Sequence, residues 1–168
     1  DCAASTDGSF LIAGVYKGNL SYGSYRLSAK GEHNVFIVKL DQNLGLLWSK
    51  TFSCTGNLQN LRITEFTSTD ILLARAFSGD LSTEAGVLSS VAEKDLFVTR
   101  MNHSDGMISW IKRLGGSGDD SISALKSEGD LIYLAGGVKK TGAEEYAFVF
   151  ELDQNGVALN SSSFKGLY

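Results

Sequence analysis

The sequence predicts an all-β fold made of three tandem four-stranded antiparallel units. Three observations predict it: the chain repeats itself, each copy consists of short apolar segments, and the segments are separated by glycine-rich turns. The chain has 168 residues, 43% apolar and 20% charged, so it is long enough to bury a core. It contains 19 glycines and no proline, so Gly, Asn and Asp must form its turns.

The repeat is visible when the sequence is aligned with itself. Leu11–Ala13 aligns with Leu72–Ala74, and Phe36 aligns with Phe97 and Phe148. The third copy is shorter than the first in one loop. The expected units span residues 1–57, 58–119 and 120–168, which together form one β domain.

Each copy contains four short apolar segments, and their spacing is typical of an antiparallel meander rather than of helices. In Val35–Val38 and Leu96–Val98 neighbouring apolar residues point to opposite sides of a strand, so both faces of these sheets should be covered. Turns such as Asp105-Gly106 lead into the outermost strand. Second strands are expected at Ser9–Tyr16, Asp70–Phe77 and Asp130–Val138, and third strands at Asn34–Asp41, Asp95–Asn102 and Tyr146–Asp153.

The segments Asn34–Asp41 and Gly45–Lys50, together with the linker Leu114–Ser121, resemble the SBBP-type β-propeller repeats of extracellular and cell-surface proteins. The long loop within Gly14–Leu27 is similar to that family, whereas the first junction, Ser53–Asn57, departs from its linker pattern. The resemblance implies three β-propeller-like blades with structural or binding roles and no shared catalytic residues. A β-trefoil or a β-prism, which also divide into three four-stranded units, is the alternative fold.

Sequons and cysteines indicate the compartment. Asn-x-Ser/Thr sequons occur at Asn19, Asn102 and Asn160, so covalent N-glycans and an extracellular or cell-surface location are expected. Cys2 and Cys54 are the only cysteines, and in that compartment an even count favours one disulfide between them. Two free thiols in a cytosolic protein are the alternative.

Few residues indicate chemistry. The net charge of −4, with scattered Lys and Arg, argues against nucleic acid as a partner, and no apolar run is long enough to span a membrane. His33 and His103 lie in turns without an evident nucleophile or carboxylate partner, so we expect no enzyme activity, no metal centre and no cofactor. The Gly116–Ser121 loop offers oxygen atoms but lacks the spacing of a dedicated calcium loop, which favours a plain connection between units.

The aromatic residues fall into two groups. Trp48 and Trp110 recur at equivalent positions of the outer strands, so they are expected to pack between units, and Asn160 replaces them in the third copy. Tyr22 and Tyr25 lie in a Gly/Ser-rich loop and are the expected ligand contacts.

Three units leave two end faces bare, whereas closed propellers have about four to eight blades. The chain begins at Asp1 inside a first strand and ends at Phe164–Tyr168, where a further junction would start, so its ends are in register for another copy. We expect a non-enzymatic structural or adhesion module that self-associates into a homo-oligomer or a glycosylated surface filament. A carbohydrate-binding lectin assembled as an oligomeric propeller is the alternative, and a piece of a longer propeller is a third interpretation.

Overall fold

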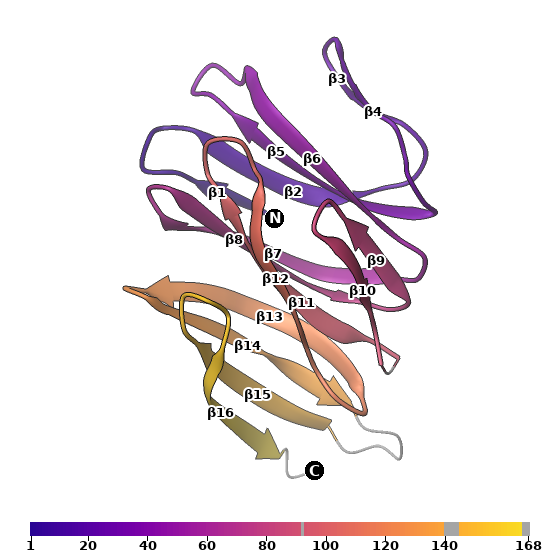
Figure 1. Ribbon diagram of the computed structural model, residues 1–168, viewed down its shortest axis with the longest axis vertical. Helices are drawn as coiled ribbons and strands as arrows, with labels where there is room; N and C mark the ends of the chain where they lie inside the picture. The colour runs from indigo at the N-terminus through magenta and orange to yellow at the C-terminus, as the bar shows by residue number, and fades with distance from the viewer. Residues whose placement is uncertain (92, 140–144, 166–168) are drawn as a thin grey trace.

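The computed structural model describes residues 1–91, 93–139 and 145–165. These residues form an all-β protein without helices, as the sequence predicted (Figure 1). The strands are β1 (Cys2–Ala4), β2 (Phe10–Tyr16), β3 (Leu20–Tyr22), β4 (Tyr25–Leu27), β5 (His33–Leu40), β6 (Leu46–Cys54), β7 (Leu58–Thr67), β8 (Asp70–Phe77), β9 (Asp80–Thr83), β10 (Gly86–Ser89), β11 (Asp95–Asn102), β12 (Ile108–Leu114), β13 (Asp119–Glu128), β14 (Leu131–Lys139), β15 (Glu145–Leu152) and β16 (Ala158–Lys165).

The strands form three antiparallel meanders in chain order. The first unit is β1-β2-β5-β6, the second is β7-β8-β11-β12 and the third is β13-β14-β15-β16. The predicted second and third strands of each copy are confirmed, with ends that move by no more than one residue. Short connections of Gly, Asn and Asp explain the meander, because tight turns join strands that are antiparallel neighbours.

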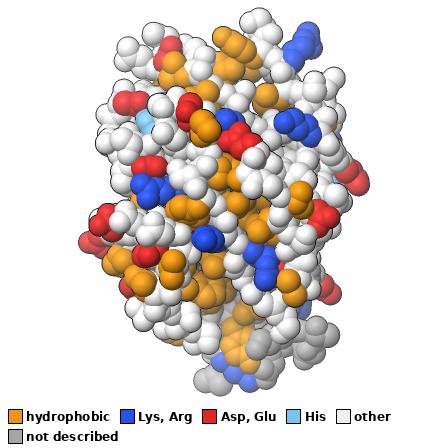
Figure 2. Space-filling model, in the orientation of Figure 1, with side chains coloured by type: hydrophobic (Ala, Val, Ile, Leu, Met, Phe, Trp, Pro, Cys, Tyr) orange, Lys and Arg blue, Asp and Glu red, His pale blue; other side chains and the backbone are white. Residues whose placement is uncertain are grey.

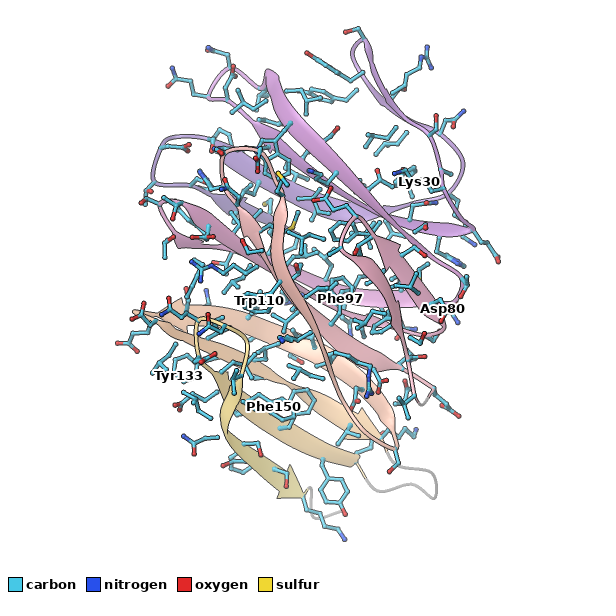
Figure 3. All side chains as sticks on the ribbon, in the orientation of Figure 1. Lys30, Asp80, Phe97, Trp110, Tyr133 and Phe150 are labelled. Atoms are coloured by element: carbon cyan, nitrogen blue, oxygen red, sulfur yellow. The ribbon has the colours of Figure 1, made fainter. Side chains whose placement is uncertain are left out.

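The three sheets are stacked in a row along the long axis of the molecule (Figure 1). Every residue of β8 is buried, as are Leu96, Phe97 and Val98 of β11, which confirms that both faces of the second unit are covered. Figure 3 shows Phe97 inside the stack and Phe150 on the third unit. The second unit contributes side chains to both interfaces. Each fully buried apolar side chain stabilises the fold by about 1.5–3 kcal/mol. The first interface contains Leu11, Val35, Ile37, Phe52, Ile71, Phe77, Phe97 and Met101, and the second contains Leu72, Leu96, Val98, Ile122, Leu134, Phe148 and Leu152.

Two hairpins interrupt the meanders where the sequence predicted only a long loop. The hairpin β3–β4 lies between β2 and β5, and the hairpin β9–β10 lies between β8 and β11. The second hairpin reaches back to the first unit, where Ser82 pairs with Ser53 and Leu81 with Cys54, and this pairing extends the first sheet to six strands. The corresponding connection of the third unit includes residues 140–144, which lie outside the described residues.

A polar clamp joins the first unit to the second. The backbone carbonyl of His103, in the β11–β12 turn, accepts hydrogen bonds from Trp48 Nε1 at 3.1 Å and from Lys39 Nζ at 3.2 Å. The Trp48 ring also lies against Gly106 of the same turn, where a Cβ atom would be 2.8 Å from the ring. The outer strand of the first unit, β6, is therefore fixed to the β11–β12 turn of the second unit by a hydrogen bond and by packing.

The same clamp joins the second unit to the third. The Gln154 carbonyl accepts hydrogen bonds from Trp110 Nε1 at 3.0 Å and from Arg100 Nη1 at 3.1 Å. A Cβ on Gly156 would be 2.8 Å from the Trp110 ring. The prediction that the two tryptophans pack between units is confirmed.

The predicted disulfide between Cys2 and Cys54 is wrong, because both cysteines are free. Cys2 lies in β1 and Cys54 in β6, which are the first and fourth strands of the meander. Three strand spacings alone separate the two strands by roughly 14 Å, and Cys54 also lies further along β6 than Ser49, which is in register with Cys2, whereas a disulfide requires Cα atoms within about 7 Å. The Cys54 thiol instead donates to the Ser78 carbonyl at 3.2 Å, and burial raises its pKa.

The Trp48–Gly106 contact predicts a measurable difference between two glycine substitutions. Gly106 (φ 70°) and Gly8 (φ 83°) share a left-handed backbone, but a Cβ on Gly8 meets no atom within 4 Å. Both alanine variants lose stability from backbone strain, and only Gly106→Ala also displaces the Trp48 ring. We expect Gly106→Ala to lower the free energy of unfolding by about 1–3 kcal/mol more than Gly8→Ala, measured by urea denaturation. Equal losses would show that the contact contributes nothing.

Candidate functional site

The edge strand β16 differs from the outer strand of the first unit. All eight residues of β16 are exposed, and among the described residues it pairs only with β15. Its counterpart β6 pairs with β5 on one side and with β9 of the second unit on the other. An exposed edge strand presents unpaired N–H and C=O groups to other strands. The exposed edge of β16 is therefore a position at which a strand of another chain would add to the third sheet.

The hairpin β3–β4 lies at the opposite end of the stack. It forms a separate two-stranded sheet, in which Leu20 pairs with Leu27 and Tyr22 with Tyr25. The Tyr22 hydroxyl donates to the Leu44 carbonyl at 2.7 Å, which ties the hairpin to its own unit. The hairpin is equivalent in chain position to β9–β10, which pairs with β6. Together, the β3–β4 hairpin and strand β16 are the candidate functional site, called here the end pair.

A cavity of about 260 Å³ lies between the hairpin and the outward face of the first sheet. Tyr22 and Tyr25, the predicted ligand contacts, both line it, so the structure brings them together. In the second and third units, the corresponding face is covered by the preceding unit. The hairpin takes over part of that role in the first unit. The other lining side chains are mainly apolar and include Ile12, Phe36, Val38 and Leu46 of the sheet and Leu20 of the hairpin.

His103 has partners that the sequence did not reveal, so the prediction that it stands alone is wrong. Its Nε2 lies 2.9 Å from Ser5 Oγ and its Nδ1 lies 3.0 Å from Lys39 Nζ. Lys39 also forms an ion pair of 2.9 Å with Asp7. The β1–β2 turn supplies Ser5 and Asp7, and no sequence spacing predicts that this turn meets the β11–β12 turn of another unit.

The proton arrangement in this cluster opposes catalysis. The Lys39 ammonium has only donors, so His103 Nδ1 must accept from it and Nε2 must carry the imidazole proton. His103 then donates to Ser5 Oγ and is not available as a base for that hydroxyl. Ser5 and His103 are also 8% and 4% exposed, respectively, which leaves little room for a substrate. We interpret the cluster of Ser5, Lys39 and His103 as a structural part of the clamp.

The three sequon residues lie in different surroundings. Asn19 is exposed in the turn before β3, and Asn160 is exposed on β16. Asn102 is half-buried at the end of β11, and its Oδ1 accepts from the backbone N–H and the hydroxyl of Ser104, both at 2.8 Å. N-glycosylation stays a prediction at all three. His33, the other histidine of the sequence, has a buried Nδ1 without a hydrogen-bond partner in the described part of the chain.

The visible face of the molecule (Figure 2) carries no concentration of one kind of charge. Figure 2 shows acidic and basic side chains scattered over the visible face without a basic stripe. Over the described ranges, no group of three or more His, Cys, Asp or Glu residues gathers as a metal cluster, and no helix is long and apolar enough to cross a membrane.

No protein-family model matches this chain, and no curated protein matches it significantly. The similarity to SBBP-type repeats therefore stays a prediction.

The Asp7–Lys39 pair predicts an acid-sensitive contribution to stability. Hydrogen bonds from Ser9 and Lys39 hold the pKa of Asp7 well below its usual value. A lowered folded-state pKa stabilises the fold above about pH 4, the unfolded-state pKa, and this contribution is lost as the pH falls toward the folded-state pKa. Asp7→Asn should lower the free energy of unfolding at pH 7, and its difference from the wild type should shrink toward pH 2.

Urea denaturation at several pH values measures this effect. Glu128→Gln is the control, because it removes an exposed charge at the end of β13. A pH-independent difference between Asp7→Asn and the wild type would contradict the ionic role of Asp7.

Proposed function

We propose that this protein is a non-enzymatic extracellular structural or adhesion module that self-associates end to end through the end pair. One observation carries the proposal: the hairpin β9–β10 pairs with β6 inside the chain, while the equivalent hairpin β3–β4 and the equivalent strand β16 pair with no such partner among the described residues. Strand β16 and the β3–β4 hairpin are therefore equivalent to the two elements, β6 and the β9–β10 hairpin, that pair inside the chain. A second copy of the chain is therefore the partner that fits.

The internal pairing sets the register between copies. Ser82 lies opposite Ser53, and the same arrangement would bring Ser21 of the first hairpin beside the C-terminal part of β16. The two surfaces differ from each other, so the contact is heterologous and joins copies head to tail. Such a contact produces a ring if the rotation closes and a filament if it does not.

The contact between copies is weaker than the contacts between units. In the third unit, Glu151 and Asn160 stand where Arg100 and Trp110 stand in the second, so the donors of the clamp are replaced. At the other end Leu44, at φ 64°, takes the left-handed turn position of Gly106. Terminal repeats with altered outer faces are typical of repeat proteins. Strand pairing thus carries the association, which should be reversible and concentration-dependent.

The proposed location rests on the sequence. The resemblance to repeats of extracellular and cell-surface proteins and the sequons support a glycosylated subunit of a surface filament. Asn19 and Asn160 are exposed, so glycans there are compatible with the fold.

Carbohydrate binding is the second candidate function. The cavity of about 260 Å³ between the hairpin and the sheet favours it, because Tyr22 and Tyr25 line it and aromatic rings offer an apolar surface on which a sugar ring would stack. Glycan-array binding that is lost in Tyr22→Ala and Tyr25→Ala, with association unchanged, would favour a lectin over a structural subunit.

The association predicts a specific effect of Leu20. Its internal counterpart, Leu81, is fully buried at the β6–β9 junction, so a charge at Leu20 should oppose pairing. The wild type should form oligomers that grow with concentration in light scattering, and Leu20→Glu should raise the dissociation constant at least about tenfold. Val87→Glu is the matched control, because Val87 is 65% exposed on the other hairpin.

Two results would contradict this proposal. A wild type that stays monomeric at every concentration would exclude self-association. Equal oligomers of Leu20→Glu and the wild type would exclude the hairpin as the contact.

A further inference from the structure

An exposed phenylalanine lies on the third unit, at one end of the stack (Figure 1). Phe164, near the end of β16, is 59% exposed and pairs with Ala147 of β15. The same position in the first unit is Phe52, which pairs with Val35 of β5. Phe52 is only 1% exposed, because it belongs to the interface with the second unit. In the described structure no further unit covers Phe164 in this way.

A second apolar residue shares this face. Val149 of β15 lies two residues after Ala147, so it points to the same side of the sheet as Phe164. Val149 is exposed, whereas its counterpart Ile37 is buried in the first interface. The third unit has lost the clamp donors but keeps apolar side chains at positions that a following unit buries elsewhere in the chain.

The cavity of about 260 Å³ in the first unit is the empty counterpart of a filled site. Its apolar lining from the sheet and the hairpin includes Ile12, Leu20, Leu27 and Phe36. The aligned residues of the second unit are Leu73, Leu81, Leu88 and Phe97. These four pack in one cluster with Phe52 of the preceding unit. In the first unit no preceding unit supplies such a side chain, and a cavity is left.

The hairpin covers the outward face of the first unit incompletely. Three sheet residues that line the cavity stay half-buried, namely Ile12, Phe36 and Val38. Their counterparts in the second unit are fully buried, namely Leu73, Phe97 and Thr99. An apolar side chain that entered the cavity would remove this remaining surface from water, which favours its binding.

We propose that Phe164 of one copy inserts into the cavity between the β3–β4 hairpin and the first sheet of the next copy. This inference rests on the proposed end-to-end association and adds a side-chain anchor to its strand pairing. Inside the chain the two contacts adjoin, because Phe52 directly precedes Ser53, which pairs with Ser82 of β9. Phe164 lies in the equivalent part of β16, so one approach of two copies makes both contacts.

Strand β16 offers a matched pair of variants for testing the anchor. Leu159 is also exposed, but its counterpart Leu47 stays 54% exposed although β6 belongs to the first interface. In light scattering of the full chain over a range of concentrations, Phe164→Ala should raise the dissociation constant of self-association at least about tenfold. Leu159→Ala should leave it unchanged. Both side chains are exposed, so both variants should keep the wild-type stability in urea denaturation.

A third variant tests the cavity from the other side. Ser49 of β6 lines the cavity, so the ring of Ser49→Trp should fill it from within the same chain. We expect a loss of association like that of Phe164→Ala. The double variant should lose no more than either single variant, because both remove the same contact.

The outcomes separate the anchor from the association itself. A wild type that associates no more tightly than Phe164→Ala would overturn the anchor and leave the end-to-end association standing. Equal losses in Phe164→Ala and Leu159→Ala would also overturn it, because the contact would not be specific to Phe164. Glycan binding in the cavity that persists in the oligomers would show that Phe164 does not occupy it. A monomeric wild type would overturn both proposals.

Discussion

Burial of both faces of the second sheet is the constraint on which the rest of the structure depends. Every residue of β8 is buried, so this strand has no solvent-facing side and needs a sheet on each face. The first and third units supply those sheets. Apolar burial is not directional, so it does not by itself select one rotation between sheets. The clamps of Trp48 and Trp110 on the following turns select it, because an indole N–H must meet one carbonyl.

The ends of the stack follow from the same constraint. A unit with a neighbour on only one side keeps an apolar face toward solvent unless its sequence changes. The first unit covers part of its outward face with the β3–β4 hairpin, and the third unit replaces the clamp residues with Glu151 and Asn160. These changes weaken face-to-face stacking at the ends but leave the backbone edge of β16 exposed. Strand pairing is thus the interaction that the ends retain, which is why the proposed association uses it.

The sequence predicted the fold better than it predicted contacts. The repeat and the short apolar segments located β8 and β11 to the residue, because hydrophobic patterning is a local signal. The pairing of β9 with β6 and the meeting of Ser5 with His103 join distant segments, and no local pattern encodes them. The disulfide prediction failed for the same reason, since cysteine count carries no information on strand order. Of the candidate site, the sequence identified Tyr22 and Tyr25 but not the edge strand beside which a partner would pair.

Differences between aligned copies are more informative about function than the shared pattern. Positions that match between copies, such as Phe97 and Phe148, serve packing, and any unit stacked on a neighbour needs them. Where Asn34 becomes Asp95, the backbone surroundings stay the same and the side chain exchanges a donor for an acceptor. Such an exchange is destabilising for a buried group on its own, because no packing gain accompanies it. It becomes favourable with a positively charged partner, and Arg113 supplies one at 3.0 Å, so comparison of the copies shows how a second substitution in the same unit compensates the first.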